Sequence, residues 1–245
     1  MKKRLLMVVS LVLVLTMVFS FSGIAYAISN DNPNQCKNLQ AIKNGIKVKN
    51  EVIENGQNVT VVTDSKELEN LKNEFGIVAP NGKKLQRIEI CEPITAPNTN
   101  GTSFNNPASP IQTLVWDYYI KSITDRGTGW YFPNDPYMDN FWDGPDVATI
   151  SQTQSIDATA NASVGVTVSE ISASVGFSVT SSYSVTLTST TTVPAGSTLE
   201  VKTYITYKRV DYDVWADNIG SDDTYYATGS AYKPLGSYFM KIWYY

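Results

Sequence analysis

Carboxylate and hydroxyl groups are the main side chains available for acid–base or nucleophilic chemistry in this 245-residue chain, which contains no histidine. Without imidazole, Ser-His-Asp and Cys-His nucleophile systems and His-ligated zinc are excluded. No Gly-x-Ser-x-Gly elbow is present. A carboxylate pair remains as a catalytic alternative, as in glycan-active enzymes. We expect a protein that is not an enzyme.

A segment rich in rings and carboxylates, from Trp130 to Asp146, is the candidate binding site. We predict that it forms a loop. Rings beside carboxylates can grip a sugar or a choline headgroup through stacking, hydrogen bonds and cation–π attraction. The alternative is that the rings cover the end of a β core and the carboxylates are solvated. The binding candidates are Trp130, Tyr131, Tyr137 and Trp142.

The aspartates of this segment do not have the spacing of a calcium-binding loop. Pro133, Pro136 and Pro145 also prevent them from sharing one face of a helix. We therefore expect neither a metal ion nor a cofactor.

The chain has two cysteines, Cys36 and Cys91. In an exported protein a single pair most simply forms one disulfide, which would stabilise the fold by about 4 kcal/mol in the chain-entropy model. Two separate free thiols are the alternative.

Residues 152–193 alternate small apolar residues with Ser, Thr, Gly or Asn and contain only two charges, Asp157 and Glu170. This period of two predicts β structure. Apolar residues occupy even positions up to Val168 and odd positions from Ile171 onward. A hairpin with Ser169 and Glu170 in its loop explains this change, because it places both apolar sets on one face. A β-bulge at the same place is the alternative.

Such a hairpin has the 9 to 11 residues per strand that a transmembrane β-strand needs, with its one charge at the tip. The pattern resembles the insertion hairpin of aerolysin-type and epsilon-toxin-type β-pore-forming proteins. A soluble sheet with one buried face gives the same alternation. The insertion candidates are Val164, Val166, Val168, Ile171, Val175, Phe177 and Val179.

The organisation of the chain follows from its composition. Residues 1–27 form an export signal with basic residues, an apolar run and an Ala-Tyr-Ala end, so we expect cleavage after Ala27 and secretion. The remaining chain has 16 basic and 23 acidic side chains, a net charge of −7, which argues against nucleic acid as a partner. We expect a module at 28–92, a Pro/Asn-rich linker at 93–113 and a β domain at 114–245.

The module is predicted to be α+β, with a strand at 58–63, a helix capped by Asp64 or Ser65 that stops at Gly76, and a strand at 85–91. The β domain is predicted to contain a strand from Thr198 to Trp215 and two last strands joined by a turn at 233–236. The expected fold is mainly β: an elongated antiparallel sandwich with a long Ser/Thr-rich hairpin, preceded by the α+β module.

Three motifs carry a second resemblance: Trp116-Asp-Tyr, Ile171-Ser-Ala-Ser-Val-Gly-Phe177 and Val193-Pro-Ala-Gly196. With them, residues 114–245 resemble a group of small exported β-rich proteins of Gram-positive-type bacteria. That group has no established activity, so the resemblance implies secretion and β architecture and transfers no site residue.

These observations favour a secreted, non-enzymatic β protein that acts by contact with a cell envelope, a glycan or a membrane surface. The first alternative is a pore-forming protein that inserts the hairpin at 158–187 and assembles into homo-oligomers. The second is a glycan-active enzyme that uses carboxylates.

Overall fold

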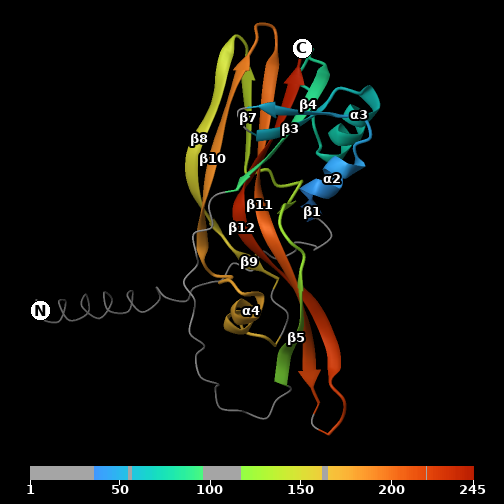
Figure 1. Ribbon diagram of the computed structural model, residues 1–245, viewed down its shortest axis with the longest axis vertical. Helices are drawn as coiled ribbons and strands as arrows, with labels where there is room; N and C mark the ends of the chain where they lie inside the picture. Colours follow the sequence, from blue (N-terminus) through green and yellow to red (C-terminus); the bar gives the residue numbers. More distant parts are fainter. Residues whose placement is uncertain (1–35, 55–56, 96–116, 162–164, 219) are drawn as a thin grey trace, which may run out of the picture.

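The computed structural model describes residues 36–54, 57–95, 117–161, 165–218 and 220–245. It is mainly β and antiparallel, as the sequence predicts. The molecule is elongated, and the long strands β11 (Thr198–Asp217) and β12 (Thr224–Tyr244) run along it (Figure 1). The predicted signal peptide with its cleavage point, and residues 96–113 of the predicted linker, lie outside the described residues.

β11 and β12 pair along almost their whole length and are the central strands of a ten-stranded sheet. The predicted turn at residues 233–236 is wrong, because Pro234 and Gly236 lie inside β12. They pair with Tyr207 and Thr206 at a register shift. A bulge therefore accommodates the proline and glycine that would otherwise end the strand.

The first region of the chain extends this same sheet. β4 (Leu85–Thr95) pairs with β12, and β3 (Gln57–Val62) and β2 (Asn50–Glu54) follow outward. The predicted helix is confirmed as α3 (Ser65–Glu74), with the Asp64 side chain accepting from the backbone amides of Lys66 and Glu67. Residues 93–95, predicted to be linker, belong to β4.

One core lies under the helices. α2 (Leu39–Gly45) and α3 cover one face of the sheet, where Leu71 and Phe75 pack against Ile88, Met240 and Tyr238. The short strands β1 (Lys37–Asn38) and β6 (Trp130–Tyr131) close this side by pairing with each other, and β6 also pairs with β11. At the other end of the molecule, β5 (Asp117–Asp125) pairs with β11, and β9 (Thr159–Ala160) pairs with β12.

A second layer completes the sandwich. β8 (Asp146–Asp157) and β10 (Ser182–Val193) form a separate two-stranded antiparallel sheet, here called the ribbon. Its apolar face packs on the long strands through Val185, Leu187, Leu199 and Phe239. The strand β7 (Met138–Asp143) pairs with β11 beside it.

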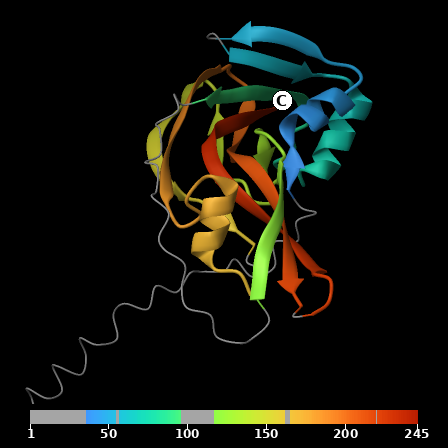
Figure 2. The same cartoon turned by 60° about the horizontal axis from the view of Figure 1, so that its bottom comes forward.

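The predicted strands on both sides of Ser169 and Glu170 are wrong. Residues Val168–Val175 form the helix α4, which packs beside β5 (Figure 2). Thr167 and Glu170 form a capping box at its start, and Gly176 ends it in the left-handed conformation, with φ of 79°. Ile171 and Val175 share its buried face. The Thr-x-x-Glu spacing signals this helix in the sequence, but the period-two pattern obscures it.

The predicted disulfide is also wrong, because Cys36 and Cys91 are both free and buried. Their surroundings differ. Cys36 lies near Tyr131, Tyr232 and Arg209, whereas Cys91 packs in the core beneath the ribbon. Burial raises the pKa of the Cys36 thiol to about 11 and that of Cys91 to about 12. Both thiols are therefore protonated at neutral pH.

Candidate functional site

The insertion candidates lie in residues 158–181, which connect the two strands of the ribbon. The solvent face of the ribbon carries mostly hydroxyl groups, with cross-strand pairs such as Ser151–Thr188 and Thr153–Thr186. The opposite face carries Ile150, which is buried, and Gln152 and Gln154, which are half-buried. Apart from Asp146 and Asp157 at its ends, the ribbon carries no charged side chain.

Side-chain packing attaches the ribbon to the rest of the molecule. Its strands hydrogen-bond with each other and form no ladder with the ten-stranded sheet. Among the described residues, Gln152 donates to the Met138 sulfur at 2.7 Å, and Ser237 Oγ donates to the Thr186 carbonyl at 3.5 Å. The Lys233 ammonium of β12 also lies 5.0 Å from the Tyr183 ring centroid of β10. Separating the two layers would therefore break few hydrogen bonds.

The register of the ribbon has the centre that the sequence predicts. Asp157 pairs with Ser182. Asp157 lies 12 residues before Ser169 and Ser182 lies 12 residues after Glu170, so the pair is centred on the predicted loop. The backbone amide of Ala158 also donates to the Ser181 carbonyl at 3.0 Å, in the same register. Beyond this point the strands separate, because Ala160 pairs with Ala231 of β12. The ribbon keeps this register as far as residues 158 and 181, but the hairpin pairing predicted beyond them, such as Val168 with Ile171, is absent because Val168–Val175 form α4.

The insertion candidates between these residues form part of another core. Ile171, Val175, Phe177 and Val179 are buried against β11 and β12, and Val166 packs against them half-buried. Val168 is 39% exposed, and Val164 lies outside the described residues. All of the buried candidates belong to the apolar set of the predicted hairpin. The same residues therefore supply a helix face here and would supply a strand face if the segment were extended.

The aromatic binding candidates do not form one site. Tyr131 is fully buried and packs against Tyr238 with ring centroids 4.9 Å apart. Trp130 is half-buried and lies under the Arg209 guanidinium, 4.8 Å from its ring centroid. Trp142 packs half-buried against the core beneath the ribbon, whereas Tyr137 is 41% exposed. The predicted loop is largely strand, since β6 and β7 contain three of these four residues.

Two of the four aspartates of this segment, Asp139 and Asp143, have partners in the fold. Asp139 forms an ion pair with Lys202, which also pairs with the buried Glu200. Burial alone would lower the pKa of Lys202, but hydrogen bonds with Asp139 and Glu200 raise it. Asp143 accepts a hydrogen bond from the Thr198 hydroxyl. These contacts give the two carboxylates structural partners.

Ser230 and Lys233 have Ser-x-x-Lys spacing, a nucleophile pattern that the sequence reasoning missed. In the structure Ser230 Oγ donates to Asp211 at 2.7 Å, and the Lys233 ammonium lies 5.0 Å from the Tyr183 ring centroid. The two side chains therefore have separate partners.

Within the described residues, no three acidic or cysteine side chains gather into a metal-binding group. Among the same residues, no helix has the length and apolar character needed to cross a membrane. No protein-family model matches this sequence, and no curated protein matches it.

Proposed function

We propose that this protein is an exported, non-enzymatic protein that acts on membranes. In this proposal residues 158–181 leave the fold, extend the ribbon and insert as a transmembrane hairpin in a pore assembled from several copies. The observation that carries the proposal is the register of β8 and β10, which is centred on Ser169 and Glu170 although no turn is formed there.

This register allows α4 and its flanks to become strands without any slip in the ribbon. Continued pairing would bring Ala160 opposite Val179 and Val166 opposite Ala173. Both sets of apolar residues would then lie on the face that Ile150, Val185 and Leu187 already occupy in the ribbon. The ribbon would act as a preformed template for the new strands.

The extended segment has the composition that a lipid-spanning hairpin requires. Each new arm has about 11 residues, which matches the thickness of the hydrocarbon layer. Glu170, at the predicted tip, is the only charged residue from 158 to 181. The polar Gln152 and Gln154 lie in the ribbon, outside the new arms. One face of each arm is apolar, and the other is rich in Ser and Thr, as contact with lipid and with water demands.

A vesicle-leakage assay with an engineered lock tests this proposal. The Ala160→Cys/Ala231→Cys variant would link β9 to β12, where these residues are paired. It should fold normally and release little dye until a reductant is added, because Ala160 must leave β12 for the hairpin to extend. The control, Ser151→Cys/Thr188→Cys, links paired residues on the hydroxyl face of the ribbon and should leave leakage unchanged.

Two results would refute the proposal. Wild-type protein that releases no dye from vesicles of any lipid composition would exclude pore formation. An oxidised lock that leaks as fast as the control would show that residues 158–181 stay in place.

A further inference from the structure

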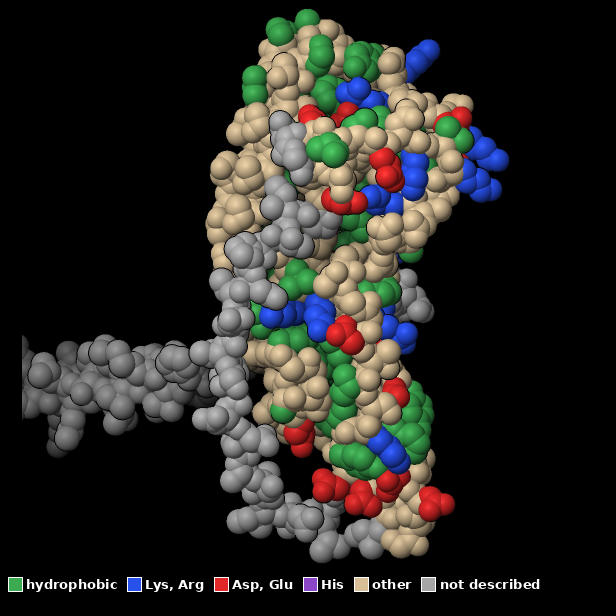
Figure 3. Space-filling model, in the orientation of Figure 1, with side chains coloured by type: hydrophobic (Ala, Val, Ile, Leu, Met, Phe, Trp, Pro, Cys, Tyr) green, Lys and Arg blue, Asp and Glu red, His purple; other side chains and the backbone are tan. Residues whose placement is uncertain are grey.

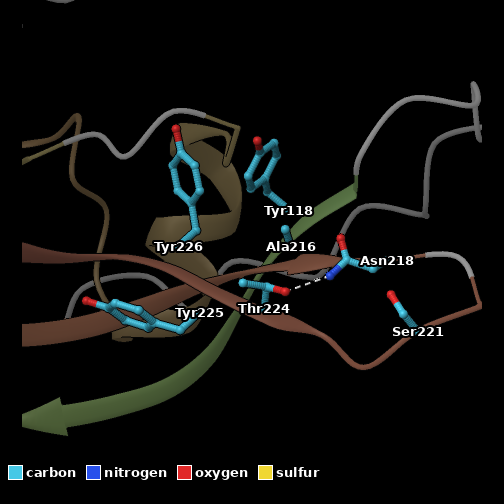
Figure 4. A pocket seen from close by; sticks show the side chains of 7 residues that line it. All are labelled: Tyr118, Ala216, Asn218, Ser221, Thr224, Tyr225 and Tyr226. Carbon is cyan, nitrogen blue, oxygen red and sulfur yellow. Dashed lines mark hydrogen bonds between the residues drawn. The ribbon is translucent and has the colours of Figure 1, made fainter.

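A pocket lies at the α4 end of the molecule. It has a volume of about 590 Å³ and lies between β5, β11 and β12 (Figure 4). Three tyrosines supply its aromatic surface, Tyr118 from β5 and Tyr225 and Tyr226 from β12. Tyr118 and Tyr226 meet edge to face with ring centroids 4.8 Å apart. Tyr225 and Tyr226 are about half exposed, at 51% and 46%, so the rings are accessible to a ligand.

The charge around this pocket is negative. Asp117 adjoins Tyr118, Asp217 adjoins Ala216, and Asp222 and Asp223 precede Thr224 in the turn. Asp117 and Asp217 are direct cross-strand partners. Among the described residues of 117–125 and 216–226, the one basic side chain is Lys121. Its ammonium pairs with the Asp223 carboxylate at 3.5 Å. Figure 3 shows acidic side chains gathered below an apolar area at this end. The pocket is therefore suited to a cation.

Two polar side chains of the pocket, Asn218 and Thr224, are already hydrogen-bonded to each other. The Asn218 amide donates to the Asp222 carbonyl at 3.0 Å. It also donates to Thr224 Oγ1 at 2.7 Å, and Figure 4 shows this second bond. A sugar would need free, convergent hydrogen-bonding groups. A quaternary ammonium needs none, because ring faces and nearby negative charge attract it. Lys121 provides an example at this end, with its ammonium 4.1 Å from the Trp215 ring centroid.

We infer that this tyrosine pocket binds the quaternary ammonium of a choline lipid headgroup. The inference rests on the proposed membrane action, and it names the surface on which that action begins. Tyr118 also contacts the segment that must move, because a Cβ on Gly165 would lie 2.2 Å from a ring carbon of Tyr118. Binding here would therefore place residues 158–181 next to the lipid.

Cosedimentation with phosphatidylcholine vesicles tests the pocket without requiring a pore. Tyr226→Leu should weaken binding about tenfold, because it removes a ring face, whereas Tyr226→Phe should stay within about twofold. Tyr245→Leu is the matched control, since Tyr245 is similarly exposed at 44% and is not a pocket residue. It should bind as wild type does.

Two further binding experiments identify the ligand. Replacing most of the phosphatidylcholine with phosphatidylethanolamine of the same acyl chains should weaken binding, and free choline chloride should compete with the vesicles. Equal binding to both lipids, or wild-type binding by a folded Tyr226→Leu, would overturn the inference. The inference would also be overturned if the wild-type protein bound a polysaccharide but no vesicles, and if Tyr226→Leu abolished the polysaccharide binding.

The results separate this inference from the proposed function. Tyr226-dependent binding to phosphatidylcholine without any dye release would support the pocket and refute insertion. If Tyr226→Leu releases dye as the wild type does, lipid binding at the pocket is refuted and insertion is supported.

Discussion

At the residue scale, the buried polar groups of this protein mainly stabilise the folded state. Asp211 has a buried side chain that accepts hydrogen bonds from Arg209, Arg126 and Ser230, each at 2.7 Å. Burial alone would raise the pKa of Asp211, but the hydrogen bonds from Arg209, Ser230 and Arg126 together lower it. A carboxylate with a lowered pKa stabilises the fold at neutral pH and loses this effect in acid.

Asp211→Asn should therefore lower the free energy of unfolding at neutral pH by about 2–3 kcal/mol, because two guanidinium groups lose their charged partner. The wild-type contribution is fully present above about pH 4 and is lost as the pH falls through the lowered folded-state pKa. The variant should lose less stability than wild type between pH 5 and pH 3. Urea unfolding at these pH values measures both effects. The exposed Asp135→Asn is the control, and equal pH dependence in all three proteins would contradict the assignment.

The two thiols give a second prediction at this scale. Because both are buried and protonated, native protein should react with a thiol reagent at pH 8 far more slowly than unfolded protein, which should show two reactive groups per chain. A reductant should leave the urea midpoint unchanged. A midpoint that falls on reduction would indicate that the cysteines are linked after all.

At the scale of elements, the central feature is that one set of apolar residues fits both α4 and the proposed hairpin. Ile171 and Val175 are four residues apart, a spacing that shares a face in a helix and also in a strand. The neighbours Ala173 and Ser174 are both exposed on α4. In the extended hairpin, however, Ala173 would face lipid and Ser174 would face water.

Lysine at these two positions should therefore have opposite effects. Ala173→Lys should abolish dye release, since a lysine facing lipid costs up to about 2–4 kcal/mol in every copy. Ser174→Lys should retain dye release and shift the ion selectivity of the pore toward anions. Both variants should have wild-type circular dichroism and thermal stability. Leakage that responds equally to both changes would argue against this strand orientation.

Sequence periodicity predicted β3, β4 and β11 and the centre of the ribbon register, because alternation along a half-buried strand is a local signal. It did not predict β6 or β7, which lie in the segment expected to be a loop. It failed at α4, where the Thr167–Glu170 capping box and packing on the long strands override the alternation. It also failed at Pro234, where pairing with β11 carries the strand through a bulge. The aromatic site could not be predicted, because the burial of Tyr131 depends on contacts with Phe75, Tyr204 and Tyr238 from distant parts of the chain.

At the scale of the whole molecule, the two compositional regions share one sheet. β4 pairs with β12 over most of its length, and the Arg87 guanidinium lies 4.7 Å from the Trp243 ring centroid. We therefore expect both regions to unfold together. Tryptophan fluorescence, which reports on the second region, and far-ultraviolet circular dichroism should give coincident urea transitions. Two separated transitions would indicate independent domains.

The molecule combines a firmly paired sheet with a ribbon attached by side-chain packing and a helix placed between the ribbon strands. This arrangement restricts the proposed rearrangement to residues 158–181 and leaves the ten-stranded sheet intact except for β9. The pocket at the same end would bring this segment to a choline-lipid surface.

The most direct test is a cross-link between Val166→Cys and Ala173→Cys in a chain whose native cysteines are replaced by alanine. With α4 formed, Ala173 lies inside the helix and Val166 lies before its N-cap Thr167, so the two residues are not paired, whereas the extended hairpin would pair them and allow a disulfide. We predict that the disulfide forms on phosphatidylcholine vesicles and not in solution. The offset pair Val166→Cys/Ser174→Cys should form much less in either state. Dye release without the 166–173 cross-link, or with preferential 166–174 linkage, would contradict the account.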